Sequence, residues 1–228
     1  MKRLASVVAL AVVVLFGTMA ARALRIATPA ATTGTAIAIP AIDTAAAALH
    51  LAAAVRFPTV SLASGGPIDT AAFLGLHQYL QAAFPRVHAA LTRELVAGLS
   101  LVYTWKGSDS TLAPVVLMGH VDVVPVPEPN LSDWEHAPFS GDTAGGYVWG
   151  RGAIDDKSTV IAVLEAVEGL LRTGHTPKRT IYLTFGHDEE VGGRYGARVI
   201  VDQLVARGVK PALVLDEGGF MGARMIPG

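Results

Sequence analysis

Short apolar runs alternate with helix-forming segments in the second half of the chain, and this alternation constrains the fold more than any other feature. Residues 115–118, 181–185 and 212–215 form three such runs, as expected of strands that are buried on both faces. Residues 158–172 place their apolar side chains on one stripe of a helix, and residues 194–207 form a second helix candidate. The pattern predicts an α/β fold, with a mostly parallel mixed sheet flanked by helices.

The first half of the chain contains two further helix candidates and a strand. Asp43 is a plausible N-cap of an alanine-rich helix that ends near Phe57. Asp69 is a plausible N-cap of a second helix, which Pro85 ends. Residues 99–105 are expected to form a strand that precedes the first of the three apolar runs.

The N-terminus has the pattern of an export signal. Lys2 and Arg3 precede an almost wholly apolar stretch over residues 4–23, which ends in the A-x-A sequence at residues 21–23. The alternative is an uncleaved membrane anchor, because a bilayer span needs roughly 20 apolar residues. Residues 1–23 are therefore expected to be a signal peptide or an anchor, and residues 24–42 a linker. The protein is expected to be exported, or else anchored through its N-terminal segment.

Composition and absent motifs exclude several classes of function. The chain has no cysteine, which excludes thiolate zinc sites, iron–sulfur clusters and cysteine nucleophiles. A net charge of -1 argues against nucleic acid as a partner. The glycines at 150 and 152 begin like a dinucleotide fingerprint, but Asp155 replaces the third glycine. The G-x-S-x-G and H-E-x-x-H motifs are absent.

Histidine and carboxylate side chains follow each apolar run. His120 and Asp122 follow the first run, the segment 187–190 follows the second, and Asp216 follows the third, while Asp155 precedes a helix. Sites in open α/β sheets form at the carboxyl ends of the strands. We therefore expect these four segments to deliver their side chains to the same edge of the sheet.

So many carboxylates at one place require a cation, because they would otherwise repel one another. One histidine with several carboxylates suits Zn²⁺, Co²⁺ or Mn²⁺, and a carboxylate shared by two metals would build a co-catalytic site for hydrolysis. Each motif alone has a simpler explanation. The pair Glu189–Glu190 would be a solvated turn, and residues 155–157 an N-terminal helix cap. The coincidence of all of them at successive strand ends favours the metal site.

In order and spacing, these motifs resemble a known family. They are GHVDVVP at residues 119–125, WGRGAIDDK at 149–157, GHDEEVGG at 186–193 and DEGGF at 216–220. The chain is similar to the dizinc metallopeptidases that include carboxypeptidase S, glutamate carboxypeptidase and aminoacylase-1, and most similar to the branch of carboxypeptidase S and the N-acyl-amino-acid hydrolases. The resemblance implies a zinc-exopeptidase-like catalytic domain over residues 43–228.

The resemblance also implies a role for each matching residue. Asp155 would bridge two zinc ions, and its peptide bond to Asp156 would be cis. Glu189 would be the general base that takes a proton from the attacking water, and Asp122 would hold the second ring nitrogen of the histidine ligand. The remaining zinc ligands would be His120 and Asp216 on one ion and Glu190 on the other.

In members of this family the chain continues past the position that corresponds to Gly228, and the part that follows includes a lid and dimerisation domain. That part carries the histidine that completes the second zinc site, and neither His136 nor His187 replaces it. The chain is therefore expected to be the N-terminal part of the catalytic domain, with one fuller metal site and one half-built site. A homodimer is expected only with the lid domain.

The resemblance implies a zinc-dependent hydrolase of the amide bond in peptides or N-acyl amino acids that carry a free carboxylate. Membrane contact is expected only through an uncleaved N-terminal segment. The alternative function is a non-catalytic metal- or ligand-binding remnant of such an enzyme. An aminopeptidase or deacetylase would use the same chemistry with a different substrate pocket.

Overall fold

The structure is a computed structural model that describes residues 2–24, 42–63 and 66–217. The chain divides into two compact units, residues 1–39 and residues 40–228. The expected linker over residues 24–42 lies almost entirely outside the described residues, and so does the end of the last motif, residues 218–220.

The first unit contains one helix, α1 (Lys2–Ala23). Its segment Ser6–Ala23 has a mean hydropathy of 2.0 and none of it is buried. By length and composition this helix could cross a membrane, and a signal sequence near the N-terminus has the same properties. Both interpretations of the N-terminal segment therefore stay open.

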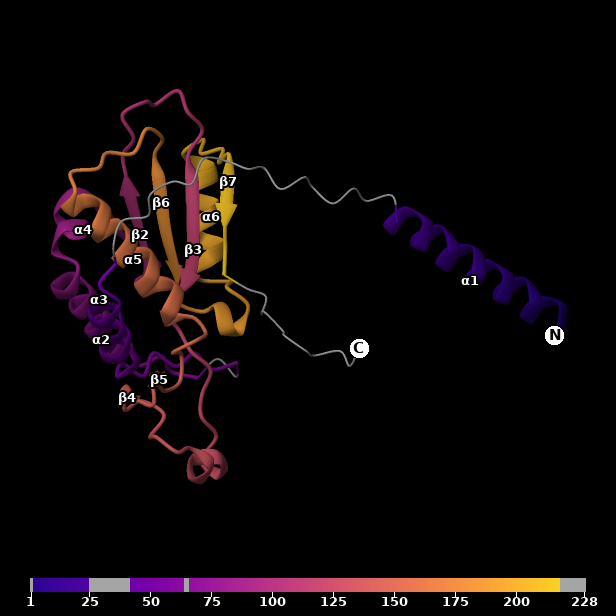
Figure 1. Ribbon diagram of the computed structural model, residues 1–228, viewed down its shortest axis with the longest axis horizontal. Helices are drawn as coiled ribbons and strands as arrows, with labels where there is room; N and C mark the ends of the chain where they lie inside the picture. Colours follow the sequence, from indigo (N-terminus) through magenta and orange to yellow (C-terminus); the bar gives the residue numbers. More distant parts are fainter. Residues whose placement is uncertain (1, 25–41, 64–65, 218–228) are drawn as a thin grey trace. The chain divides into compact units, whose positions relative to one another are not determined.

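The second unit is built on a five-stranded sheet with the strand order β1-β2-β6-β3-β7 (Figure 1). The strand β3 pairs in parallel with β6 and β7, whereas β2 pairs antiparallel with β1 and β6. This arrangement confirms the predicted mixed sheet. The strands are β1 (Thr92–Val96), β2 (Ser100–Trp105), β3 (Val115–His120), β6 (Ile181–Gly186) and β7 (Leu213–Leu215).

Helices cover both faces of this sheet. On one face, Leu101 and Tyr103 of β2 belong to the larger core cluster with the helices α2 (Thr44–Val55), α3 (Thr70–Ala83), α4 (Pro85–Ala90) and α5 (Lys157–Arg172). Val102, between them in sequence, packs on the opposite face against Ile200 and Leu204 of α6 (Ala197–Ala206). Successive side chains of a strand point to opposite faces, so one short strand contributes to two cores. Figure 1 shows α5 and α6 on opposite sides of the strands.

The two predicted N-caps are confirmed. The Asp43 side chain accepts a hydrogen bond from the Ala46 backbone, and the Asp69 side chain accepts from the backbone of residues 71 and 72. The second helix ends before Pro85, as predicted, and Pro85 also begins a short helix, α4, that was not predicted. Proline suits the first helical position, where its missing N–H would have no partner within the helix.

The strand β7 also differs from the prediction. Its three residues are exposed, at 48% or more, although the apolar run was expected to be buried on both faces. Within the described residues β7 pairs only with β3, so it lies at the edge of the sheet.

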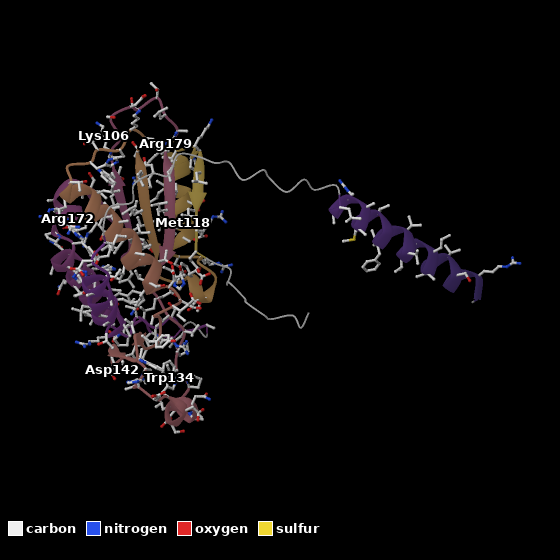
Figure 2. All side chains as sticks on the ribbon, in the orientation of Figure 1. Lys106, Met118, Trp134, Asp142, Arg172 and Arg179 are labelled. Carbon is white, nitrogen blue, oxygen red and sulfur yellow. The ribbon has the colours of Figure 1, made fainter. Side chains whose placement is uncertain are left out.

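A loop between β3 and α5 carries a small hairpin that the sequence did not predict. The loop contains the 3-10 helix η1 (Glu128–Asp133), and the hairpin consists of the strands β4 (Asp142–Ala144) and β5 (Tyr147–Trp149). Figure 2 shows Trp134 and Asp142 beyond the carboxyl end of β3, and Lys106 and Arg179 at the opposite end of the sheet. The hairpin therefore lies at the end of the sheet where the predicted site residues gather.

Candidate metal centre

The predicted site residues come from four segments at the carboxyl ends of β3, β6 and β7 and at the start of α5. His120 is the last residue of β3, and Glu189 and Glu190 begin the 3-10 helix η2 (Glu189–Val191) after β6. Asp155 lies in the turn before α5, and Asp216 directly follows β7. The sheet topology thus places these segments together, as the strand-end argument predicted.

His120 is the buried centre of this group. Its side chain is 1% exposed. Its Nδ1 lies 3.0 Å from the backbone oxygen of Asp122 and 3.3 Å from the carboxylate Oδ1 of the same residue. Its Nε2 points toward Asp155, whose Oδ1 is 2.9 Å away. One nitrogen is therefore engaged by Asp122, and the other faces the carboxylates.

Asp122 has a second task that the sequence did not reveal. Its completely buried carboxylate accepts hydrogen bonds from the backbone N–H groups of Glu189, at 3.0 Å, and Glu190, at 3.2 Å. These bonds connect the end of β3 to the start of η2. Asp122 therefore orients the histidine and fixes the backbone of both glutamates.

The turn before α5 holds the two aspartates of the WGRGAIDDK motif. The peptide bond between Asp155 and Asp156 is cis, as the resemblance implied. Asp156 occupies the N-cap position of α5, but its side chain makes no capping hydrogen bond. Its Oδ2 instead accepts from the His120 backbone N–H, at 3.2 Å. A Cβ on Gly119 would lie 2.8 Å from this Oδ2, so any larger residue at that position would force the carboxylate to shift.

Lys157 places a buried amine behind this turn. Its Nζ donates to the backbone oxygens of Ala54, at 3.1 Å, and Phe57, at 2.6 Å, at the end of α2. Burial lowers the pKa of Lys157 to about 7, although the charge of Asp122 acts in the opposite direction. The side chain thus ties the aspartate turn to α2.

Carboxylates from three of the four segments surround Nε2 of His120. Besides Asp155, an oxygen of Glu189 lies 3.7 Å away and one of Glu217 lies 3.8 Å away. Two sets offer ligand atoms that all lie within 4.8 Å of one another. They are His120, Asp155 and Glu190, and His120, Asp156 and Glu217.

The first set consists entirely of predicted metal ligands. Asp216, the fourth predicted ligand, lines a cavity beside His120 but belongs to neither set. The second set contains two residues that the sequence interpretation left out, Asp156 and Glu217. Each is the neighbour of a predicted ligand in its motif, and the two-carboxylate sequences at 155–156 and 216–217 were the available signal.

Burial and the close approach of charged groups shift the protonation equilibria of this cluster. Burial alone would lower the pKa of His120, but hydrogen bonds to Asp122 and Asp155 and the charge of Asp122 raise it to about 10. Burial and the charge of Asp155 raise the pKa of Glu190, and burial and the charge of Asp156 raise that of Glu217. Burial also raises the pKa of Asp156. The carboxylates therefore retain protons more readily than usual, and His120 carries the compensating positive charge.

The donor set fits a divalent metal ion. One imidazole nitrogen and several carboxylate oxygens are suitable ligands for Zn²⁺, Co²⁺ or Mn²⁺. Metal binding competes with ligand protons, so a cation would take the place of the proton on Nε2. The two histidines named above as unsuitable are engaged elsewhere. His187 Nδ1 lies 2.7 Å from Ser100 Oγ, and His136 Nδ1 lies 3.0 Å from Asp142.

A cavity of about 410 Å³ opens beside the cluster. Its lining includes His120, Glu189 and the acidic pair after β7, together with Arg198 and the apolar side chains of Met118, Ala197 and Val201. The cavity therefore combines polar groups that can act on a bond with apolar side chains that can contact a substrate.

Comparisons with known proteins identify relatives of this chain. Residues 116–225 match the model of peptidase family M20/M25/M40. The chain is 45% identical over 174 residues to the probable carboxypeptidase S-like 2 of Dictyostelium discoideum, covering 75% of this chain and 33% of that protein. It is 44% identical over 170 residues to the N-fatty-acyl-amino acid synthase/hydrolase PM20D1 of Xenopus tropicalis, covering 74% of this chain and 32% of that protein. The chain thus spans about a third of the length of these relatives.

The fold is also similar to that of a solved structure from this family. The M20 family metallo-carboxypeptidase Sso-CP2 of Sulfolobus solfataricus superposes with a TM-score of 0.61 at 22% identity, covering 76% of this chain and 37% of that chain. The similar sequences identify the family of this chain, and the solved structure shows that the two chains share a fold. Over the segment that it shares with them, the chain belongs to peptidase family M20/M25/M40.

Proposed function

We propose that the chain carries the metal ligands and the general base of a zinc-dependent hydrolase. The substrates would be peptides or N-acyl amino acids, with cleavage of an amide bond next to an amino acid that has a free carboxylate. The observation that carries the proposal is the convergence of His120 Nε2 with carboxylates from separate segments of the chain. The names of the relatives, a carboxypeptidase and an N-fatty-acyl-amino acid hydrolase, support this substrate class.

His120, Asp155 and Glu190 would be metal ligands, with His120 and Glu190 on different ions as the resemblance implies, and we retain Asp216 as a further ligand because of its matching motif. Zinc bound there would polarise the scissile carbonyl and make the attacking water more acidic. Asp122 would keep Nε2 of His120 directed at the metal through its contacts to Nδ1.

Glu189 is the residue best placed to move the proton. Its side chain is half exposed beside the cavity, while its backbone N–H is fixed by Asp122. Its carboxylate would take the proton from the attacking water and deliver it to the nitrogen of the leaving amine. The half-exposed position lets Glu189 meet substrate, whereas a fully buried carboxylate would not.

The decisive experiment compares Glu189→Gln with the unmodified chain and with Glu128→Gln, an exposed control in η1. Zinc binding would be measured by calorimetry, and turnover with N-acyl amino acids and peptides, each with a free or an amidated carboxyl end. We expect Glu189→Gln to bind zinc normally and to lose activity about 10²–10⁴-fold, and Glu128→Gln to behave like the unmodified chain. Equal turnover in Glu189→Gln would contradict the role of Glu189.

Two further results would decide between the proposed functions. The two ligand sets share His120, so we expect one tightly held zinc ion per chain. Two tightly held ions would contradict this expectation. Zinc binding without turnover of any substrate would favour the alternative, a non-catalytic metal-binding module.

We further propose that α1 directs export, as a cleaved signal or as an anchor, and that residues 43–228 form part of a catalytic domain. The apolar character of α1 supports the first proposal. Expression with and without residues 1–23, followed by fractionation of membrane and soluble material, tests it. Retention of the complete chain in the cytoplasm would contradict export.

A further inference from the structure

We propose that Asp188 is a positioning residue, whose buried carboxylate fixes the loop that presents Glu189 and Glu190 to the metal centre. The inference rests on the proposed function for its effects on metal binding and turnover, whereas its effect on the loop is independent of that function. Asp188 directly follows His187 after β6 and is 3% exposed.

Four backbone N–H groups of the loop converge on Asp188. Its carboxylate accepts from Tyr195 through Oδ2 and from Gly196 through Oδ1, both at 2.7 Å. Its backbone oxygen accepts from Gly193, at 2.8 Å, and from Val191, at 3.2 Å. The loop of residues 188–196 therefore closes on its own first residue.

The loop sequence is suited to this closure. A Cβ on Gly196 would lie only 2.4 Å from Asp188 Oδ1, so the short approach of carboxylate and backbone requires glycine. Gly192 and Gly193 have φ values of 98° and 63°, which side-chain-bearing residues rarely adopt. The glycines at these positions thus let the chain turn back toward Asp188.

A carboxylate is the side chain that this arrangement needs. Both oxygens accept from backbone N–H groups, and hydrogen bonds to an ionised acceptor are shorter and stronger than neutral ones. An amide in the same place would turn its NH₂ group toward one of the two donors, leaving that backbone N–H without an acceptor. Within the described residues Asp188 forms no salt bridge, so the loop amides are its partners.

The loop is held at both ends by buried carboxylates from different strands. Asp122, after β3, binds the amides of Glu189 and Glu190, and Asp188, after β6, binds those of Tyr195 and Gly196. Asp122 also contacts His120, so its substitution would disturb a metal ligand directly. Asp188 belongs to neither set of ligand atoms, and its substitution therefore tests positioning alone.

The test is the variant Asp188→Asn, with Asp109→Asn as its matched control. Asp109 also accepts a backbone N–H, that of Thr111, but in an exposed turn. Amide hydrogen exchange in the metal-free chain would be followed residue by residue. Titration with Co²⁺, monitored by its visible absorption, would report ligand geometry, and kcat and KM would be measured wherever the unmodified chain turns over.

We expect Asp188→Asn to speed exchange at Glu189 and Glu190 as well as at Tyr195 and Gly196. We also expect it to weaken Co²⁺ binding or lower kcat about 10-fold or more, with KM little changed. A purely local role would move only the amides of Tyr195 and Gly196, and that result would overturn the proposal. Asp109→Asn should leave all of these measurements unchanged.

A second variant keeps the test decisive if Asp188→Asn does not fold. Gly196→Ala pushes a methyl group against Asp188 Oδ1 while the carboxylate remains, and it should change the exchange of Glu189 and Glu190 in the same direction. If both variants unfold globally, Asp188 is structural and the positioning role is wrong. An unmodified chain without turnover would contradict the proposed function, but the exchange measurement would still decide the role of Asp188.

Discussion

The end of β6 and the end of β7 deliver acidic residues to the same cavity under different physical conditions. Beyond β6, His187 and Asp188 are buried and backbone hydrogen bonds to two carboxylates hold the loop. The strand β7 is itself exposed, and among the described residues the backbone N–H of Glu217, beyond this strand, bonds to the neighbouring Asp216, at 3.0 Å. Within the described part of the chain, the centre of the sheet therefore holds its functional groups by more hydrogen bonds than the β7 edge does.

The largest expected effect comes from removing core volume at the centre. Phe185→Ala in β6 deletes a completely buried ring and should lower the free energy of unfolding by about 3–5 kcal/mol. Val214→Ala in β7 deletes part of a half-exposed side chain and should cost less than about 1 kcal/mol. Urea unfolding monitored by circular dichroism would measure both, and equal losses would remove the contrast between centre and edge.

The second prediction concerns His77, a buried residue of α3. Burial and the charge of Arg93 lower its pKa to about 4 from 6.5 in the unfolded chain. Between these pH values the unfolded chain binds a proton that the folded chain does not, so stability falls as the pH falls. The loss below pH 4 should total roughly 3 kcal/mol.

Comparison of His77→Leu with the unmodified chain would isolate this contribution. The free energy of unfolding of the variant should depend less steeply on pH between about 6.5 and 4. The same substitution at the exposed His175 should leave the slope unchanged. Identical slopes in His77→Leu and the unmodified chain would show that His77 does not titrate in this range.

The third prediction compares the effect on metal binding of a carboxylate at the centre of the sheet, after β3, with that of a carboxylate at its edge, after β7. Asp122→Asn disturbs the histidine and both glutamate amides, so zinc affinity should fall about 10–100-fold. Glu217→Gln changes a carboxylate that the edge strand does not fix, and we expect a loss of less than about 10-fold. Calorimetric titration with zinc measures both, and a larger loss in Glu217→Gln would reverse the ranking.

The smallest effect is expected at the opposite edge of the sheet. Glu94 of β1 accepts two hydrogen bonds from Arg207, at 2.7 and 2.6 Å, and these bonds lower the pKa of Glu94. Both side chains are a third or more exposed, so Glu94→Gln should cost only about 0.2–1 kcal/mol. Chemical unfolding at low and high salt would test it, because screening should shrink the difference.

The sequence predicted those parts of the molecule whose signals are local. The starts of α2 and α3 follow from their capping aspartates, and α5 from its apolar stripe. The convergence of His120, Asp155 and Glu190 follows from strand order, because the carboxyl ends of parallel strands lie at the same end of the sheet.

The parts that could not be predicted depend on contacts between distant segments. The strand β1 has a mostly exposed pattern of TRELV, and its strand character comes from pairing with β2. The exposure of β7 depends on which strands lie beside it. Asp122 and Asp188 are recognisable in the sequence as acidic residues. Their roles as hydrogen-bond acceptors depend on backbone N–H groups that only the folded loop brings to them.

Gly119 has a consequence for transplanting this centre into another protein. The carboxylate of Asp156 reaches the backbone of His120 through the space that a side chain at residue 119 would fill. A designer who copied only the histidine and the acidic residues onto a new sheet would leave a methyl group or more in this space, and the carboxylate of the aspartate would have to move away from the histidine backbone. The graft must therefore first place a glycine on the strand directly before the histidine, and the ligands can be added afterwards.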